Sequence, residues 1–123
     1  GAKLAAGLND ILPDGELIVA VNTGDDFMHL GLHVSPDIDT VLYTLSGLND
    51  QQRGWGRAGE TWQFMDALKQ IGGEDWFLLG DKDLALHVVR THRLRTGDSL
   101  GEITAHFAKR LGIKALIVPM IPG

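Results

Sequence analysis

The sequence predicts an α/β fold in which a parallel sheet is flanked by helices. Apolar, β-branched runs at residues 16–23 and 114–120 are typical of buried strands, and "WFLL" at 76–79 is a third strand candidate. The stretches between them show the spacing of amphipathic helices, and this alternation favours strand–helix–strand units with parallel strands. With 123 residues, 44% of them apolar, the chain is long enough for one core. We therefore expect a single α/β domain over residues 1–123.

The first elements along the chain are a helix and a strand. Leu4, Leu8 and Ile11 recur at helical spacing, and "PDG" at 13–15 ends this helix. The run "ELIVAVNT" at 16–23 is continuously apolar at its centre, which predicts a strand that is buried on both faces. A helix that opens a chain directly before such a strand usually has a strand of its own in front of it. We therefore expect the first strand of the sheet to be missing from this chain.

Helix-start signals delimit the later elements. Ser35 followed by Pro36 predicts the start of a helix, with the serine hydroxyl as its N-cap. Ser99 and Glu102 form a capping-box pattern, which predicts the start of the last helix. Apolar residues at helical spacing predict two further helices, at 62–71 and 84–94.

The segment "NTGDDFMHLGLHVSPDIDT" at 22–40 combines four aspartates with two histidines. The aspartates are Asp25 and Asp26, directly after the first strand, and Asp37 and Asp39, at the start of the next helix. Ligands of parallel sheets bind beyond the carboxyl ends of the strands. This acidic turn and the polar turn at 80–83 both follow strand candidates, so we expect them to meet at one edge of the sheet.

Carboxylates at this density have three interpretations. They suit a hard cation such as Mg²⁺, which prefers oxygen ligands and bridges to substrate phosphates. One of them can instead act as a general base that takes a proton from an attacking hydroxyl. A structural role is the third, because such aspartates also cap free N–H groups. Side chains two apart on a helix point about 200° apart, so we expect Asp39 to face the site and Asp37 to cap the helix.

Other polar side chains have both functional and structural interpretations. His29 and His33 lack a third partner at a recognised spacing, so they do not indicate zinc, and substrate hydrogen bonding or a structural role fits them better. The loop "GWGRAGETW" at 54–62 suits either a cover over a flat ring or phosphate, or a tryptophan that pins the loop to the core. Arg90 and Arg93 share a helix face that either reaches a phosphate or is solvated.

Composition limits the classes of partner. Eleven Lys and Arg against sixteen Asp and Glu give a net charge of -5, which argues against a nucleic-acid-binding surface. No apolar run reaches membrane-spanning length, so we expect no membrane partner. The chain has no Cys, which excludes a disulfide framework and a thiolate metal site and is compatible with the cytoplasm.

Four segments of the chain resemble the 2-phospho-L-lactate transferase family of archaea and bacteria. They are "VNTGDDFMHLGLHVSPDIDTVLYTLSGL", "GWGRAGETW", "GDKDLALHVVRT" and "LGIKALIVPM", and they occur in the family's order over nearly the whole chain. The resemblance implies a Rossmann-like fold and a role in the biosynthesis of the deazaflavin coenzyme F-420. It also implies transfer of a 2-phospho-L-lactyl or phosphoenolpyruvyl group from a guanosine diphosphate-linked donor to the deazaflavin Fo. GMP is then released, and Mg²⁺ is required.

The resemblance further implies roles for single residues. Asp39 matches the aspartate that contacts Fo in the family, and Asp25 and Asp26 match the acidic pair near the metal and the phosphates. We therefore expect Asp39 and Asp26 to be catalytic, and Asp25, Asp26 and Asp39 to bind the metal. Substrate-binding residues are expected at Asn22, Thr23, His33, Asp39 and Gly1, the last being what remains of the family's glycine-rich phosphate loop.

The chain departs from the family pattern at both ends. It lacks most of the glycine-rich loop, and it has "IPG" where the family continues with an acidic Ser-Asp-Asp run and a C-terminal half. Leu78 occupies a position where some relatives carry a basic residue that contacts Fo. We therefore expect an inactive fragment of a larger transferase, which as a whole forms a cytoplasmic homodimer. The alternative is a UDP-sugar-binding regulatory protein of the gluconeogenesis-factor family, although its "ADDGGSSG" and "PPGDIRN" segments fit this chain less well.

Overall fold

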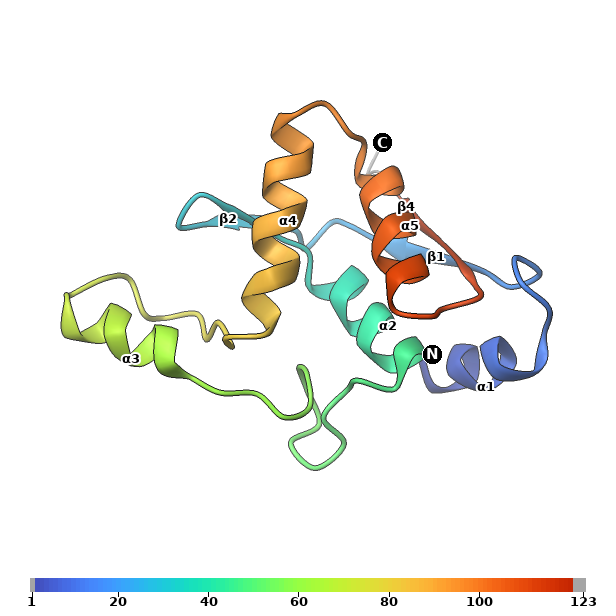
Figure 1. Ribbon diagram of the computed structural model, residues 1–123, viewed down its shortest axis with the longest axis horizontal. Coiled ribbons are helices and arrows are strands. Elements are labelled where there is room, and N and C mark those ends of the chain that lie inside the picture. The colour runs from blue at the N-terminus through green and yellow to red at the C-terminus, as the bar shows by residue number, and fades with distance from the viewer. Residues whose placement is uncertain (1, 121–123) are drawn as a thin grey trace.

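The computed structural model describes residues 2–120, and a pair of parallel strands organises it (Figure 1). β1 (Ile18–Asn22) pairs with β4 (Leu116–Met120), with Ile18 opposite Leu116 and Asn22 opposite Met120. Parallel strands need a long crossover connection, and here it contains every element between β1 and β4. The predicted α/β fold, with parallel strands flanked by helices, is confirmed.

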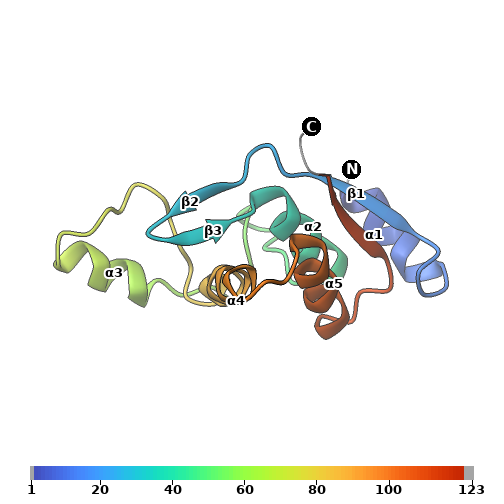
Figure 2. The same cartoon turned by 90° about the horizontal axis from the view of Figure 1, so that it is seen from above.

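The core of the molecule lies between the two strands and the helices α2 (Pro36–Ser46) and α5 (Leu100–Arg110). Figure 2 shows both helices on the same side of the strand pair. Ile38 and Leu42 of α2 and Ile103 of α5 are fully buried, and Val21 and Ile117 of the strands pack against them. α1 (Ala2–Ile11) packs against α2 at the edge of this core.

Only one face of the strand pair is covered within residues 2–120. Side chains alternate between faces along a strand, so Val21 is 4% exposed whereas Ile18 is 64% exposed. Leu116, Val118 and Met120 of β4 lie on the same open face and are each about half exposed. The prediction that the strand at 16–23 is buried on both faces is therefore wrong for the described residues, because α2 and α5 pack on a single side.

An antiparallel hairpin forms within the acidic turn, where the sequence does not predict strands. β2 (Phe27–His29) pairs with β3 (Leu32–Val34), and the two residues between them are Leu30 and Gly31. Both have positive φ angles, 51° and 76°, as a tight two-residue hairpin turn requires. The hairpin is too short for an alternating pattern to stand out in the sequence.

The predicted strand at 76–79 does not form. This segment is irregular, and its aromatic side chains pack onto the hairpin instead of pairing with a strand. The rings of Phe77 and Phe27 meet edge to face with their centroids 5.1 Å apart, and Trp76 meets His29 in the same way at 4.9 Å. A short apolar run signals burial, and here the burial comes from side-chain contacts without a backbone ladder.

Two further helices complete the chain, α3 (Gln63–Gln70) and α4 (Asp83–Arg95), close to the predicted ranges. The predicted capping box is confirmed, because Ser99 Oγ accepts a hydrogen bond from Glu102 N and Glu102 Oε1 accepts one from Ser99 N. α2 begins at Pro36 as predicted, but the Ser35 side chain makes no capping bond there. Among the described helices, none combines the length and the apolar character that crossing a bilayer demands.

Candidate functional site

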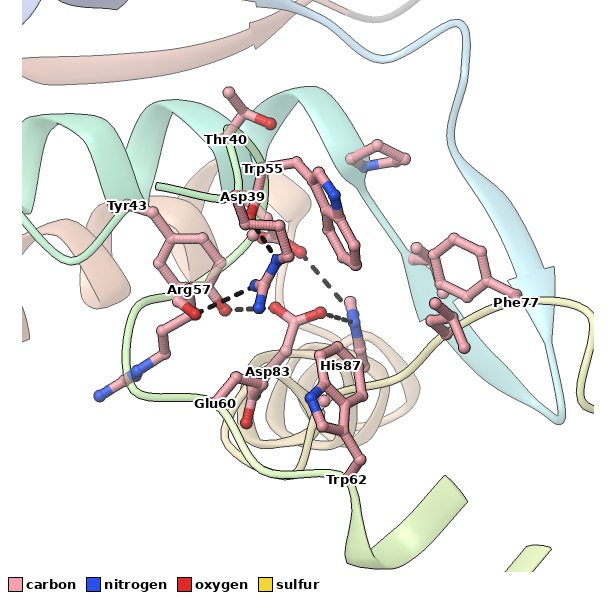
Figure 3. Close-up of a pocket in the computed structure, with 16 residues that line it drawn as sticks. Asp39, Thr40, Tyr43, Trp55, Arg57, Glu60, Trp62, Phe77, Asp83 and His87 are labelled. Atoms are coloured by element: carbon pink, nitrogen blue, oxygen red, sulfur yellow. Dashed lines mark hydrogen bonds and ion pairs between the residues drawn. The ribbon is translucent and has the colours of Figure 1, made fainter. Parts of the chain in front are cut away.

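A pocket of about 350 Å³ lies between α2, the loop before α3, the segment before α4, and α4 itself (Figure 3). Its polar side is formed by carboxylate, imidazole and phenol groups, and its apolar side by indole and phenyl rings. The polar groups are Asp39 and Tyr43 of α2 and Asp83 and His87 of α4, and the rings belong to Trp55, Trp62 and Phe77.

Asp39 is placed in this pocket by the first turn of α2, where its amide binds Ser35 O at 3.0 Å. Its side chain is buried, and its Oδ1 atom accepts a hydrogen bond from Nη2 of Arg90 on α4. The Arg90 side chain is itself 0% exposed, so the two charges form a buried ion pair. Oδ2 of Asp39 is buried and has no hydrogen-bond partner. One carboxylate oxygen of Asp39 is therefore left without a hydrogen-bond partner among the described residues.

A second acidic group, Asp83, begins α4 and faces Asp39 across His87. Asp83 Oδ1 accepts a hydrogen bond from the Tyr43 hydroxyl, and Asp83 Oδ2 lies 2.9 Å from His87 Nε2. These partners assign the His87 tautomer: Nε2 donates to the carboxylate, and Nδ1 accepts from Arg90 Nη1 at 3.4 Å. His87 Nδ1 lies 3.7 Å from Asp39 Oδ2, so it does not donate to that oxygen.

The pKa values of this network follow from burial and from its hydrogen bonds. Burial raises the pKa of Asp39 to about 6, against the attraction of Arg90 and His87. Burial also acts to raise the pKa of Asp83, but the hydrogen bonds of His87 and Tyr43 outweigh it and the pKa lies below its usual value. Burial and the neighbouring Asp83 raise the pKa of Tyr43, so the phenol keeps its proton. The pKa of Asp39 therefore lies closer to neutral pH than that of an ordinary carboxyl group, which favours a general base.

Asp26, the other residue predicted to be catalytic, sits on the loop before the hairpin and is held by two neighbours. Its Oδ2 atom accepts from Ser35 Oγ at 2.7 Å and lies 3.0 Å from Nε2 of His33. Its Oδ1 atom is buried without a partner, like the Oδ2 atom of Asp39. The Ser35 hydroxyl, predicted as a helix cap, is therefore used to fix this carboxylate.

The other predicted site residues have different surroundings. Asp25 is exposed, and Asp37 is half-buried on the helix turn that carries Asp39. Asn22 accepts a hydrogen bond from Gly24 N in its own turn, at 2.9 Å. The Thr23 hydroxyl donates to Met120 O at 2.6 Å and ties the end of β1 to the end of β4. Gly1 lies outside the described residues.

One group of acidic and histidine side chains among the described residues could hold a metal ion. Asp39, Asp83 and His87 place one ligand atom each within 4.8 Å of one another. Most of their ligand atoms already have hydrogen-bond partners, and Arg90 adds a positive charge beside them. The unpaired oxygens of Asp26 and Asp39 are instead two hard donors, each buried and otherwise unsatisfied. Buried polar atoms rarely lack a partner, and carboxylate oxygens are the donors that Mg²⁺ prefers.

The loop that carries the predicted "GWGRAGETW" segment forms the aromatic wall of the pocket. Arg53 lies over the rings of Trp55 and Trp62, at 4.2 and 5.4 Å from their centroids. Its guanidinium also donates to Trp55 O at 3.0 Å and to Arg57 O at 3.2 Å. Arg53 thus stabilises the loop conformation, and both indoles border the pocket. Leu78, where some relatives are basic, lines it as well.

Several residues of this network were not predicted from the sequence pattern. Arg90 was given a phosphate-binding or solvated role, whereas it is buried against Asp39. A signal was present, because Asp83, His87 and Arg90 are spaced by four and three residues on one face of a helix. Tyr43 likewise follows Asp39 by four residues. Asp81, in the polar turn at 80–83 that was expected at the ligand edge, accepts hydrogen bonds from the Thr61 hydroxyl and the first amides of α3.

Comparison with known proteins identifies the family to which this chain belongs. The family described as "2-phospho-L-lactate transferase CofD" matches residues 1–122. The chain belongs to the CofD family. The four segments that carried the resemblance therefore reflect membership of this family, as predicted.

Curated relatives of this CofD-family chain carry two names. A phosphoenolpyruvate transferase of Nocardia farcinica (strain IFM 10152) is 43% identical over 120 residues, which cover 97% of this chain and 36% of the relative. A 2-phospho-L-lactate transferase of Methanosarcina mazei (strain ATCC BAA-159 / DSM 3647 / Goe1 / Go1 / JCM 11833 / OCM 88) is 43% identical over 118 residues, covering 96% and 39%. The chain thus spans less than half the length of these two relatives.

Proposed function

We propose that the full-length protein containing this chain transfers a 2-phospho-L-lactyl or phosphoenolpyruvyl group from a guanosine diphosphate-linked donor to Fo. The proposal is supported by the CofD match over residues 1–122 and by relatives named for the two transfers. The same match favours it over the UDP-sugar-binding alternative. We place the reaction in coenzyme F-420 biosynthesis on the strength of the sequence resemblance.

The pocket supplies groups that suit the two parts of Fo. Trp55, Trp62 and Phe77 give it flat apolar walls, which suit a fused aromatic ring system. Asp39 lies on the polar side with one buried oxygen free. In the proposed complex the deazaflavin ring packs against the aromatic wall, and the terminal ribityl hydroxyl reaches Asp39. The single observation that carries this orientation is the unpaired Oδ2 atom of Asp39.

In the proposed reaction, the Fo hydroxyl oxygen attacks the phosphorus that bears the three-carbon group. The bond from this phosphorus to the bridging oxygen breaks, and GMP leaves with the electron pair. Asp39 Oδ2 accepts the hydroxyl proton. A carboxylate oxygen has two lone pairs, so Oδ2 can contact a cation and accept this hydrogen together. We propose Asp25, Asp26 and Asp39 as ligands of Mg²⁺, which when bound would neutralise the charge on the diphosphate.

The remaining parts of the proposal concern binding and assembly. Asn22, Thr23 and His33 lie around the acidic turn and are proposed to contact the donor, and from the resemblance we propose the same of Gly1. From the resemblance we also propose that the full-length protein is a cytoplasmic homodimer. Light scattering coupled to size-exclusion chromatography would give its oligomeric state directly.

The test is a transfer assay with the full-length protein, Fo, Mg²⁺ and either guanosine-linked donor, with the product separated and identified by mass spectrometry. Asp39→Asn should lower kcat about 10²–10³-fold, because it removes the proposed base and a transition-state contact. Asp37→Asn, on the same helix turn, is the matched control and should retain activity. Absence of any three-carbon adduct of Fo with the wild-type protein would refute the proposed function, and equal rates for Asp39→Asn and wild type would refute the role of Asp39.

A further inference from the structure

Two adjacent residues of α4, Arg90 and Thr91, hold the backbone of a single residue in β3. Thr91 Oγ1 accepts a hydrogen bond from His33 N at 2.7 Å, and Arg90 Nη1 donates one to His33 O at 3.1 Å. Thr91 Oγ1 also donates to His87 O at 2.6 Å, one helical turn earlier. Both side chains are buried. Both the backbone N–H and the backbone carbonyl of His33 are therefore held by α4.

The same two residues connect the Asp26 and Asp39 carboxylates. Arg90 Nη2 binds Oδ1 of Asp39 directly. Asp26 is reached through His33, whose backbone is held by α4 and whose Nε2 lies 3.0 Å from Asp26 Oδ2. Each carboxylate is thus held at one oxygen, and the second oxygen of each is buried and unpaired.

We propose that Arg90 and Thr91 are positioning residues that set how the free oxygens of Asp26 and Asp39 are presented to a divalent cation. The proposal rests on the metal site of the proposed function. Hydrogen bonds to the far side of a metal ligand orient it, and their loss usually weakens metal binding. A guanidinium suits this task because its rigid planar fork binds Asp39 and His33 O at fixed angles, which a lysine ammonium does not.

A role in stability alone would not require this arrangement. Folding is served when every buried polar atom has a partner, yet this network leaves one oxygen of each carboxylate unsatisfied, as well as Nε of Arg90. Such atoms cost free energy unless a ligand takes them up. A bound cation would therefore contact the unpaired oxygens, Oδ1 of Asp26 and Oδ2 of Asp39. The residues that hold the other oxygen of each carboxylate orient these unpaired atoms.

The test measures Mn²⁺ binding to the full-length protein by electron paramagnetic resonance, without donor or Fo. Thr91→Val keeps the shape of the side chain but removes the hydroxyl that holds His33, and we expect Mn²⁺ affinity to fall about 10–100-fold. Thr91→Ser restores the hydroxyl and should recover most of the affinity. Arg90→Lys keeps the charge without the fork and should weaken binding in the same range. Arg93→Lys, on the same helix but paired with Asp98 at the surface, is the control and should leave it unchanged.

The outcomes separate this inference from the proposed function. If Thr91→Val and Arg90→Lys bind Mn²⁺ as wild type does, Arg90 and Thr91 do not position the ligands. If the wild-type protein binds no Mn²⁺, the inference is overturned, whatever the transfer assay shows. If the variants shift Mn²⁺ affinity as expected while the wild type transfers nothing to Fo, the inference stands and the proposed function fails. Thermal unfolding of each variant shows whether it is folded. If Arg90→Lys is unfolded, the comparison of Thr91→Val with Thr91→Ser still tests the inference.

Discussion

The buried pair of Asp39 and Arg90 determines how substitutions at the residue scale should be interpreted. From the sequence alone, removal of Asp39 is expected to reduce turnover far more than stability. The structure changes this expectation, because loss of Asp39 leaves the guanidinium of a fully buried Arg90 without its counter-charge. An uncompensated buried charge is strongly destabilising, whereas replacing both partners by apolar groups is often neutral.

We therefore expect Asp39→Leu to lower the free energy of unfolding by about 3–5 kcal/mol. The double variant Asp39→Leu/Arg90→Met should recover most of this loss, because neither charge then remains. Transfer activity of the full-length protein should stay absent in both. Chemical denaturation of the wild type, the two single variants and the double variant gives the four values needed. A double variant no more stable than Asp39→Leu would show that the pair does not account for the loss.

Part of the site could be predicted from residue types and spacing. Asp39 was assigned to the site and Asp37 away from it by helix geometry, and the structure buries the first and leaves the second half-exposed. The partner of Asp39 was not predictable in the same way, since Arg90 lies 51 positions along the chain. Helical spacing shows which residues share a face but not what that face packs against. The metal-binding and catalytic roles remain predictions.

At the scale of elements, the start of α3 depends on a residue from a distant loop. No side chain next to α3 caps it. Asp81 Oδ1 and Oδ2 instead accept hydrogen bonds from the amides of Phe64 and Gln63, at 2.9 and 3.0 Å, and the Thr61 hydroxyl donates to the same carboxylate. Such a long-range cap joins α3 to the start of α4, and a local capping rule cannot find it.

This cap should depend on pH. Hydrogen bonds from the Thr61 hydroxyl and then from the Phe64 amide hold the pKa of Asp81 below its usual value. The unfolded state then binds more protons, so the contribution of Asp81 to stability is complete above about pH 4 and is lost as pH falls through the lowered pKa. We expect the amide chemical shifts of Gln63 and Phe64 to titrate in acid, measured by NMR. In Asp81→Asn these shifts should show no such titration, and an unchanged titration would rule out the cap.

The elements themselves were predicted unevenly, for identifiable reasons. Helix ranges and the Ser99–Glu102 capping box were confirmed because their signals are local. The prediction of a strand at 76–79 was wrong, and the hairpin at 27–34 was not predicted. Each depends on contacts between the two segments. Ser35 carried a valid N-cap signal, but the nearby Asp26 takes its hydroxyl. Competition of this kind is invisible to a rule that considers one helix at a time.

At the scale of the whole molecule, one face of the β1–β4 pair is apolar and is left uncovered by the described residues. It consists of Ile18, Leu116, Val118 and Met120, which lie on neighbouring strands in register. Contiguous exposed apolar surface of this kind usually marks a contact or an aggregation risk. The CofD-family relatives are more than twice as long as the matched segment.

We accordingly expect residues 1–123, produced alone, to self-associate and to lack transfer activity. Leu116→Lys/Val118→Lys places two charges on the open face and should shift the isolated chain toward monomer, measured by multi-angle light scattering. Val88→Lys, which changes an exposed apolar residue of α4, is the control and should not. If the unmodified segment is a monomer that unfolds cooperatively, the open face does not drive association.

The mutual pairing of Asp39, Tyr43, Asp83, His87 and Arg90 also has an evolutionary consequence. Their side chains make four hydrogen bonds to one another, and Arg90 donates a further one to His33 O. A mutation at one position leaves a neighbouring polar group without its hydrogen-bond partner. Natural selection therefore acts on the five residues as a group. Across homologous sequences these five positions should be inherited together or exchanged together, even where the surrounding loops diverge.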